Sequence, residues 1–405
     1  MSLKISNEQL QSAASQYGTP LYMYHAEKIT AQYQQLQNAF EGVYARFFYA
    51  SKALTNLAVL QHIHSIGCNI DCSSINEVYL ALKAGFNPEQ ILYTSNGISF
   101  EEIEAAVEAG VSVNIDSLSN LEKFGKAYGS RYPVGIRLRP NIMAGGNLKI
   151  STGHNGSKFG IPIEQLNDIL SIKDQYKLRI NCLHVHTGSE IKDVEVFIKV
   201  ADIFFDLVPS FPDLQVLDMG GGFKVPYREG EKGTDIPLLA KRVGEVLNKF
   251  ENSYGKKFQV WFEPGKFLVS ECGYLITSVN VIKETPTVIF AGINSGFNHL
   301  IRPMFYEAYH HIRNISNPNG AVKNYAITGN ICETDNFAWD RPINEIREGD
   351  LLVIENAGAY GFEMGSNYNS RFLPAQVLLR DEKMLLVRKR DTMEDLLKNQ
   401  IGLPY

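Results

Sequence analysis

The stretch FFYASKALTN, residues 47–56, joins a strand to a helix and places a lysine at the junction. Phe47–Ala50 is an apolar run typical of a buried strand, and Thr55 and Asn56 are residue types that begin helices. Lys52 stands between them. A lysine at such a corner is most simply a solvated side chain, because lysines are seldom buried. The rest of the chain decides whether this one has a further role.

The strand-to-helix pattern repeats from Phe47 to Gly265. Seven amphipathic segments, such as TNLAVLQHIHSIG, separate eight apolar runs that read as strands. Strands that alternate with helices form a parallel sheet, and eight such units over about 220 residues fit a closed (β/α)8 barrel of the TIM type. A doubly wound sheet is the structural alternative, but it would normally use fewer strands over this length. The eight runs are RFFYA, CNIDC, ILYTS, VSVNID, VGIRLR, NCLHVH, QVLDMG and QVWFEP.

Two of the helical segments carry start and stop signals. Each begins with a Ser-x-x-Glu pattern, which predicts a capping box, and each is followed by a glycine suited to a left-handed C-terminal cap. These residues are Ser74 with Glu77 and Gly85, and Ser99 with Glu102 and Gly110.

The pattern changes after Gly265, where short β-rich segments with turn residues between them predict an antiparallel β domain. LYMYHAEKI, near the N-terminus, is a further strand that we expect to pair with that domain. We therefore predict a barrel over residues 27–270, and a β-sandwich or barrel-like domain made of residues 1–26 and 271–405. The β-rich segments are YLITSVNVIKE, TVIFAGI, NYAITGN, DLLVIENAG, PAQVLLR and EKMLLVRKR.

Composition narrows the classes of function. The 405 residues are 44% hydrophobic, and 39 Lys and Arg against 44 Asp and Glu argue against a nucleic-acid surface. We see neither a secretion signal nor an apolar run of membrane-spanning length, and five cysteines, an odd count, fit reduced thiols in a cytoplasmic protein. Cys68 and Cys72, near His62 and His64, lack a matching second pair, so we expect no metal.

Polar residues stand at the C-terminal ends of all eight predicted strands. In such a barrel these ends meet at one mouth, where active sites are built. Convergence of this kind is what a site requires and what stability alone does not. In strand order the residues are Lys52, Asp71-Cys72-Ser73, Asn96, Asp116-Ser117, Arg137 with Arg139, His186 with Gly188-Ser189, Gly220-Gly221-Gly222, and Glu263-Pro264-Gly265-Lys266.

Singly, these signals are weak. Gly220–Gly222 lacks the spacing of a dinucleotide fingerprint, and fits either a tight turn or a backbone cradle for an anion, which Ser189 and Gly265 could complete. His186 alone is more often a core histidine than a catalytic one. Glu263, in an apolar strand, differs because a buried carboxylate needs a cationic partner.

One cofactor accounts for the whole set. Pyridoxal 5'-phosphate needs a lysine for a Schiff base, an anion cradle for its phosphate, and a group that controls its pyridine nitrogen. Lys52 would supply the lysine, the glycine-rich turns the cradle, and Glu263 the carboxylate that keeps the nitrogen protonated. His186 could then stack on the ring face. The lysine of the opening stretch is thus predicted to be the cofactor lysine.

Six motifs, in this order, resemble those of the diaminopimelate decarboxylases, pyridoxal-phosphate enzymes of the alanine-racemase-like barrel class. The similarity runs from about Leu21 to the C-terminus. It implies loss of CO2 from the D-centre of meso-2,6-diaminopimelate to give L-lysine, the last step of lysine biosynthesis. The motifs are YASKAL, HVHTGSE, DMGGGF, FEPGK, ICET and AGAYGFEMGSNYNSR.

The resemblance also implies roles for individual residues. Lys52 forms the Schiff base with Asp71 near it, His186 stacks on the ring, and Glu263 pairs with its nitrogen. The residues implied at the cofactor phosphate are Ser189, Gly222, Gly265 and Tyr360, and Gly221 and Lys266 are further implied cofactor contacts.

Substrate contacts are implied in the same way. Arg302 and Tyr306 match the positions that hold the distal carboxylate, Glu333 matches the residue that reads the distal ammonium, and Cys332 matches the acid that protonates the carbanion. Lys266 and Tyr360 also face the substrate. In this family the Cys-Glu pair reaches into the neighbouring subunit's site, which implies at least a homodimer.

Three positions depart from the family pattern. Lys266 replaces the usual arginine, which keeps the charge but loses the bidentate fork. CETDNF replaces Cys-Glu-Ser-Gly-Asp and places Asp335 and Asn336 in the substrate loop, and SNGIS lacks a lysine often found there. The departures thus concern substrate binding more than the cofactor chemistry.

Three other readings stay open at this point. A decarboxylase of ornithine, arginine or carboxynorspermidine would lack a use for Arg302, Tyr306 and Glu333 together. A racemase of the same barrel class fits the Cys-Glu pair and SNYNSR poorly. A regulatory homologue without activity predicts loss of Lys52 or Cys332, and both are present.

Overall fold

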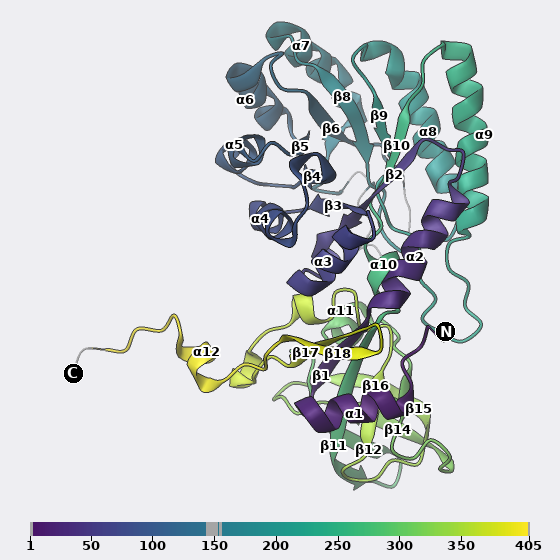
Figure 1. Ribbon diagram of the computed structural model, residues 1–405, viewed down its shortest axis with the longest axis vertical. Helices are drawn as coiled ribbons and strands as arrows, with labels where there is room; N and C mark the ends of the chain where they lie inside the picture. The colour runs from purple at the N-terminus through teal and green to yellow at the C-terminus, as the bar shows by residue number, and fades with distance from the viewer. Residues whose placement is uncertain (1–2, 143–152, 154–155, 404–405) are drawn as a thin grey trace. The chain divides into compact units, whose positions relative to one another are not determined.

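The computed structural model describes residues 3–142, 153 and 156–403, and the chain divides into two compact units (Figure 1). The barrel unit comprises Ala31–Val225 and Lys232–Leu268. The sheet unit comprises Met1–Thr30, Pro226–Glu231 and Val269–Tyr405.

Eight parallel strands of the barrel unit form a closed ring within the described residues. Their order is β5-β4-β3-β2-β10-β9-β8-β6, and pairing of β5 with β6 closes the ring, which confirms the predicted barrel. A short strand, β7 (Ile161–Pro162), pairs in parallel with the end of β6 at Leu138 and Arg139. The ring strands are β2 (Ala45–Ala50), β3 (Asn69–Cys72), β4 (Ile91–Thr94), β5 (Ser112–Ile115), β6 (Val134–Arg139), β8 (Ile180–Val185), β9 (Val216–Asp218) and β10 (Gln259–Phe262).

The seven predicted amphipathic segments form helices that lie outside the ring (Figure 1). Their apolar faces pack on the outward side chains of the strands. Phe262 of β10, for example, packs against Phe197 of α8, with ring centroids 6.2 Å apart. The helices are α3 (Leu57–Ser65), α4 (Ile75–Ala84), α5 (Phe100–Glu108), α6 (Leu118–Tyr128), α7 (Leu166–Tyr176), α8 (Glu195–Leu207) and α9 (Ile236–Tyr254); α2 (Ala26–Ala39) precedes the ring and α10 (Lys266–Val269) follows it.

One of the two predicted capping boxes forms in part, and the other does not form. The Ser74 hydroxyl accepts from the Glu77 N–H, but the Glu77 carboxylate accepts from Ser51 and from the Ser73 N–H instead of closing the box. Ser99 makes no side-chain bond to the backbone of α5, and Glu102 accepts from the Tyr93 hydroxyl. Both glutamates accept hydrogen bonds from residues of other segments. Local sequence does not reveal such tertiary contacts. The caps at Gly85 and Gly110 have the predicted left-handed φ of 106° and 77°.

The inside of the barrel is layered. Alternate residues of each strand point inward. Phe48, Leu92, Cys182, Val216 and Trp261 form one apolar cluster. Two residues further along four of these strands the inward positions are polar, whereas β2 has Ala50 there. The C-terminal half of the barrel interior therefore carries Thr94, His184, Asp218 and Glu263.

The sheet unit is built on a nine-stranded, mostly antiparallel sheet, as predicted. The predicted N-terminal strand, β1 (Leu21–His25), lies inside this sheet, antiparallel to β11 but parallel to β17. A second parallel pair joins β12 and β14, which the antiparallel prediction did not include. The remaining strands are β11 (Gly273–Glu284), β12 (Ile289–Ile293), β13 (Ile312–Asn314), β14 (Val322–Thr328), β15 (Asn336–Asn344), β16 (Leu351–Ile354), β17 (Ala375–Arg380) and β18 (Lys383–Arg388).

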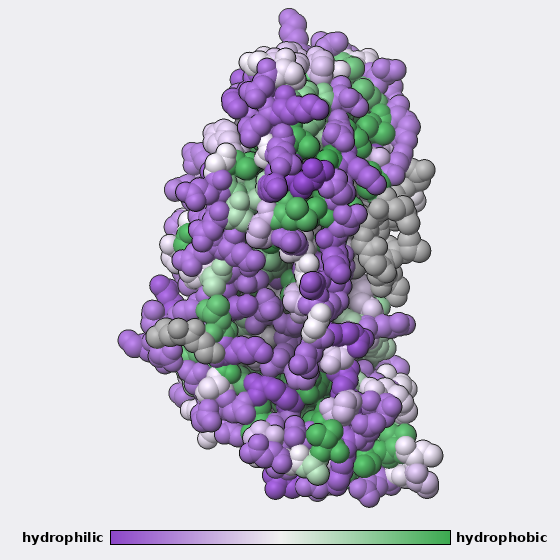
Figure 2. All heavy atoms as spheres, turned by 90° about the vertical axis from the view of Figure 1, so that its right-hand side faces the viewer, coloured by the Kyte–Doolittle hydropathy of each residue, from purple (hydrophilic) through white to green (hydrophobic). Residues whose placement is uncertain are grey.

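Helices cover part of this sheet. Helix α1 (Asn7–Tyr17) buries Leu10 and Ala13 against Met23 of β1 and Ile276 of β11. Two short helices, α11 (Arg302–Tyr306) and α12 (Met393–Leu397), lie in the connections. None of the described helices is long and apolar enough to cross a membrane, and the face drawn in Figure 2 is largely hydrophilic with scattered hydrophobic residues.

Candidate active site

Lys52 lies in a 3-10 turn that directly follows β2, at the mouth of the barrel. Its side chain is 41% exposed, and its Nζ lies 3.2 Å from Oδ2 of Asp71, which is 1% exposed. Burial, together with the charge of Glu263, raises the pKa of Asp71 to about 7, although Lys52 opposes that shift. The pair therefore holds a lysine at the mouth over a carboxyl group that titrates near neutral pH.

Beneath Lys52, three buried groups from neighbouring strands lie together. His184 Nε2 is 3.3 Å from Glu263 Oε1, and the ligand atoms of His184, Glu263 and Asp218 all lie within 4.8 Å of one another. Burial alone would raise the pKa of Glu263, but His184 and Lys52 hold it well below its usual value. Burial and the charge of Glu263 raise the pKa of Asp218 well above its usual value. Glu263 is thus the charged carboxylate of the pair.

His186 is held in one orientation at the end of β8. The Gly221 N–H donates to its Nδ1 at 3.1 Å. Burial and the nearby Arg137 lower the pKa of His186 to about 3, so the ring is neutral at physiological pH. Because Nδ1 accepts, a neutral ring carries its proton on Nε2.

The glycines at the strand ends allow backbones to approach closely. A Cβ on Gly221 would lie 2.1 Å from the Glu263 carbonyl oxygen, and a Cβ on Gly222, whose φ is 95°, would lie 2.1 Å from the Gly188 carbonyl oxygen. A Cβ on Gly265 would lie 3.2 Å from Ala50 Cβ. The turns after β8, β9 and β10 therefore form one backbone surface, beside which lies the half-buried Ser189.

Lys266 is paired in a way that the sequence did not indicate. Its Nζ bonds Glu190, which also lies 3.6 Å from Lys224 Nζ. Glu190 has a left-handed φ of 63° and directly follows Ser189. One carboxylate thus neutralises part of the charge of two lysines.

The predicted substrate residues lie in the sheet unit. Arg302 opens α11 and is 7% exposed; its guanidinium lies over the Tyr227 ring at 5.1 Å, and its Nε has no partner among the described residues. Tyr306 closes α11 and is half-buried. Tyr360 is also half-buried, with a left-handed φ of 55°.

Cys332 and Glu333 lie side by side on an exposed loop of the sheet unit. The Tyr368 hydroxyl donates to Glu333 Oε1 at 3.0 Å and lies 3.4 Å from Cys332 Sγ. Asp335, one of the departures from the family pattern, is buried beneath this loop, and burial raises its pKa to about 6. Asn336 begins β15 and is half-buried.

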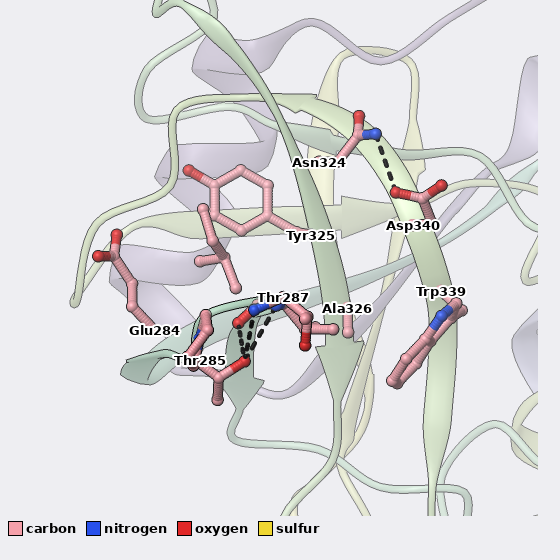
Figure 3. A pocket seen from close by; sticks show the side chains of 11 residues that line it. Glu284, Thr285, Thr287, Asn324, Tyr325, Ala326, Trp339 and Asp340 are labelled. Atoms are coloured by element: carbon pink, nitrogen blue, oxygen red, sulfur yellow. Dashed lines mark hydrogen bonds between the residues drawn. The ribbon is translucent and has the colours of Figure 1, made fainter.

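A separate pocket of about 710 Å³ lies in the sheet unit, against β12, β14 and β15 (Figure 3). Its rim includes Asn324, which donates to Asp340 at 2.9 Å. It also includes the turn in which the Thr285 hydroxyl donates to the Val288 carbonyl. The side chains that line it include none of the residues predicted for the site.

Similarity to known proteins fits this arrangement. Residues 26–270 match the family model described as pyridoxal-dependent decarboxylase, pyridoxal binding domain. The chain is 38% identical over 397 residues to the diaminopimelate decarboxylase of Methanothermobacter thermautotrophicus, a match that covers 96% of this chain and 92% of that protein. The chain belongs to the diaminopimelate decarboxylase family. It is therefore a pyridoxal-phosphate-dependent carboxy-lyase, as the sequence predicted.

Solved structures of diaminopimelate decarboxylases have the same fold. The structure from Helicobacter pylori complexed with L-lysine superposes with a TM-score of 0.88 at 33% identity, covering 96% of this chain and 98% of that one. The structure from Methanocaldococcus jannaschii in complex with L-lysine gives 0.89 at 32% identity and covers 96% and 94%. A lysine/ornithine decarboxylase of Vibrio vulnificus, at 23% identity and a TM-score of 0.81, shares the fold alone.

The barrel unit has the groups that the cofactor of this family requires. Glu263 Oε1 is buried without a well-aligned hydrogen-bond donor among the described residues, and the protonated ring nitrogen of pyridoxal phosphate would supply one. Arg137, also buried, places a fixed positive charge near Glu263 and Asp218. That charge disfavours a metal ion at the same carboxylates, although their spacing would suit one.

Sequence reasoning missed four members of this site: His184, Asp218, Glu190 and Lys224. The first two precede predicted positions by two residues on strands β8 and β9, so their inward direction was available from the strand period. Glu190 and Lys224 lie on loops after those strands, and no local pattern indicates that Lys266 pairs with Glu190.

The close approach at Gly222 yields a stability prediction. Gly222→Ala should lower the free energy of unfolding by about 1–2 kcal/mol from the left-handed φ, plus about 1–3 kcal/mol from the contact with the Gly188 carbonyl. Gly230→Ala is the matched control, because Gly230 has a φ of 75° but nothing within 4 Å of its Cβ. Denaturant unfolding of the cofactor-free variants measures both. Equal losses would show that the turn after β9 is not tightly packed.

Proposed function

We propose that this chain removes CO2 from the D-centre of meso-2,6-diaminopimelate and releases L-lysine. The observation that carries the proposal is the 38% identity to a diaminopimelate decarboxylase over 96% of the chain. The buried Arg302 and the acidic Glu333 support it, because the substrate's distal end carries both a carboxylate and an ammonium. Ornithine and arginine have no distal carboxylate to pair with Arg302.

The cofactor contacts come from the barrel unit and one tyrosine. Lys52 would hold pyridoxal phosphate covalently, Asp71 would accept a hydrogen bond from that lysine, and His186 would stack on the ring. The cofactor, when bound, draws off the electron pair that the departing CO2 leaves behind, and Glu263 favours this by keeping the ring nitrogen protonated. Ser189, Gly222, Gly265 and Tyr360 would contact the phosphate, and Gly221 and Lys266 would be further cofactor contacts.

The substrate contacts hold the distal end and supply a proton. Arg302 and Tyr306 bind the distal carboxylate, with Lys266 and Tyr360 beside it. Glu333 binds the distal ammonium. The Cys332 thiol then gives a proton to the carbon that lost CO2. The exposure of Cys332 on a loop supports its contact with a substrate bound in another subunit.

The assembly and location belong to the same proposal. The enzyme is a cytoplasmic homodimer in which Cys332 and Glu333 act in the site of the neighbouring subunit. The folding domains are residues 27–270, which bind the cofactor, and residues 1–26 with 271–405. The exposed positions of both Cys332 and Glu333 support a role across an interface.

A substrate panel tests the activity. Purified enzyme loaded with pyridoxal phosphate should release CO2 and form L-lysine from meso-diaminopimelate, with kcat/KM on the order of 10⁴ above that for ornithine or arginine, because a site built to pair a polar group rejects ligands that lack it. Arg302→Met should lower kcat/KM for diaminopimelate far more than for ornithine. Comparable decarboxylation of ornithine by the unmodified enzyme would contradict the proposal.

A further inference from the structure

The Asn369 side-chain amide makes two hydrogen bonds to Cys332. Its Oδ1 accepts from the Cys332 backbone N–H at 2.8 Å, and its Nδ2 donates to Cys332 Sγ at 3.1 Å. One planar group thus fixes both the backbone and the sulfur of the same residue. Rotation of the thiol away from this position would break the second bond.

Tyr368 contacts the sulfur from another direction. Its hydroxyl lies 3.4 Å from Cys332 Sγ and donates to Glu333 Oε1 at 3.0 Å. Its ring stacks on Phe297, with centroids 5.6 Å apart and an interplanar angle of 20°. The hydroxyl is therefore held by a packed ring, and it links Cys332 to Glu333.

The backbone conformation of the loop that carries Tyr368 and Asn369 brings both side chains to Cys332. Asn369 has φ 55° and ψ 26°, a left-handed conformation that asparagine adopts more readily than most residues. Arg371 Nη2 donates to the Asn330 carbonyl at 2.9 Å, which ties the loop to the segment just before Cys332. The contacts of Asn369 and Tyr368 thus belong to one connected pair of loops.

A donor aimed at sulfur favours the thiolate over the thiol, because hydrogen bonds to a charged acceptor are the stronger ones. Tyr368 and Asn369 lower the pKa of Cys332 by donating to its sulfur, while the neighbouring Glu333 opposes them. The Tyr368 hydroxyl has a single proton, so it turns from Glu333 to the sulfur when the thiolate forms. A thiol so placed gives up its proton more easily than a free cysteine does.

We propose that Asn369 and Tyr368 are positioning residues for Cys332, which hold its sulfur in place and stabilise the thiolate left after proton donation. The inference rests on the proposed role of Cys332 as the acid. The S–H bond breaks, a C–H bond forms on the substrate carbon, and the negative charge remains on sulfur facing the Asn369 N–H. Water then returns a proton to the sulfur.

Asn369→Asp tests this directly in the cofactor-loaded enzyme. Aspartate keeps the acceptor for the Cys332 N–H and tolerates the left-handed backbone, but replaces the donor at sulfur with a carboxylate oxygen. The pH midpoint of iodoacetamide alkylation of Cys332 should move upward, and kcat should fall about tenfold with KM within about twofold. The other four cysteines are buried, and Cys332→Ala supplies the blank for alkylation.

Asn367→Asp is the matched control. It makes the same change of charge two residues away, where the Asn367 amide donates to the Arg371 carbonyl and to Asp391 instead of Cys332. Both the alkylation midpoint and kcat should stay near those of the parent enzyme. An Asn369→Asp midpoint no higher than that of Asn367→Asp would overturn the inference.

Tyr368→Phe provides a second variant should Asn369→Asp fold poorly. Phenylalanine keeps the stack on Phe297 and removes only the hydroxyl, so the alkylation midpoint should again rise. An unchanged midpoint would refute the part assigned to Tyr368. If instead Cys332→Ala forms L-lysine at the parental rate, the acid role in the proposed function fails, whatever the alkylation data show.

Discussion

Glu263→Gln should lower the turnover of meso-diaminopimelate at least ~10²-fold while the protein still folds and binds the cofactor. Glutamine keeps the shape of the side chain but removes the charge that favours a protonated ring nitrogen. The structure indicates that Glu263 is ionised at neutral pH, because His184 and Lys52 hold its pKa low despite its burial. Steady-state kinetics and absorbance of the bound cofactor measure the two halves of the prediction.

Glu251→Gln is the control for this substitution. Glu251 is also a buried glutamate of the barrel unit, but it accepts from Lys257 and from the Phe258 N–H on the α9 side. The change should cost some stability and leave turnover within about twofold, because a lost structural hydrogen bond acts on folding. Near-normal turnover in Glu263→Gln would show that Glu263 serves only as a structural partner of His184.

The barrel and its mouth could be predicted because strand and helix periods are local signals. RFFYA and QVWFEP are apolar runs of strand length. The first forms β2 of the ring and the second forms β10. Lys52 and Glu263 are polar residues at the ends of those runs. In a parallel barrel such ends must meet, so the position of both residues followed from the pattern alone.

The pairing of side chains could not be predicted in the same way. Glu77 and Glu102 carry the capping-box pattern, yet Ser51 and Tyr93 engage them, since tertiary contacts outweigh a local cap. Asn369 lies 37 residues from Cys332 in the chain, and its role depends on a left-handed backbone that the SNYNSR motif does not announce. The parallel partner of β1, β17, likewise comes from the far end of the chain.

Lys52→Ala and Cys332→Ala should each be nearly inactive in forming L-lysine, yet a mixture of the two should regain about a quarter of the parental activity. If Cys332 acts in the neighbouring subunit's site, each mutant homodimer has two broken sites. In a mixed dimer, one site collects both defects and the other collects neither. Random association makes about half of the dimers mixed, so about a quarter of all sites are intact.

The control pairs Lys52→Ala with Glu263→Gln. Both residues lie in the barrel unit and would serve the site of their own chain, so a mixed dimer of these variants has one defect in each site and should regain nothing. Co-expression with two affinity tags allows the mixed dimers to be isolated and counted. Recovery in the control as well would point to a cause other than complementation, and mixed Lys52→Ala and Cys332→Ala dimers as inactive as their parents would place Cys332 in its own chain's site.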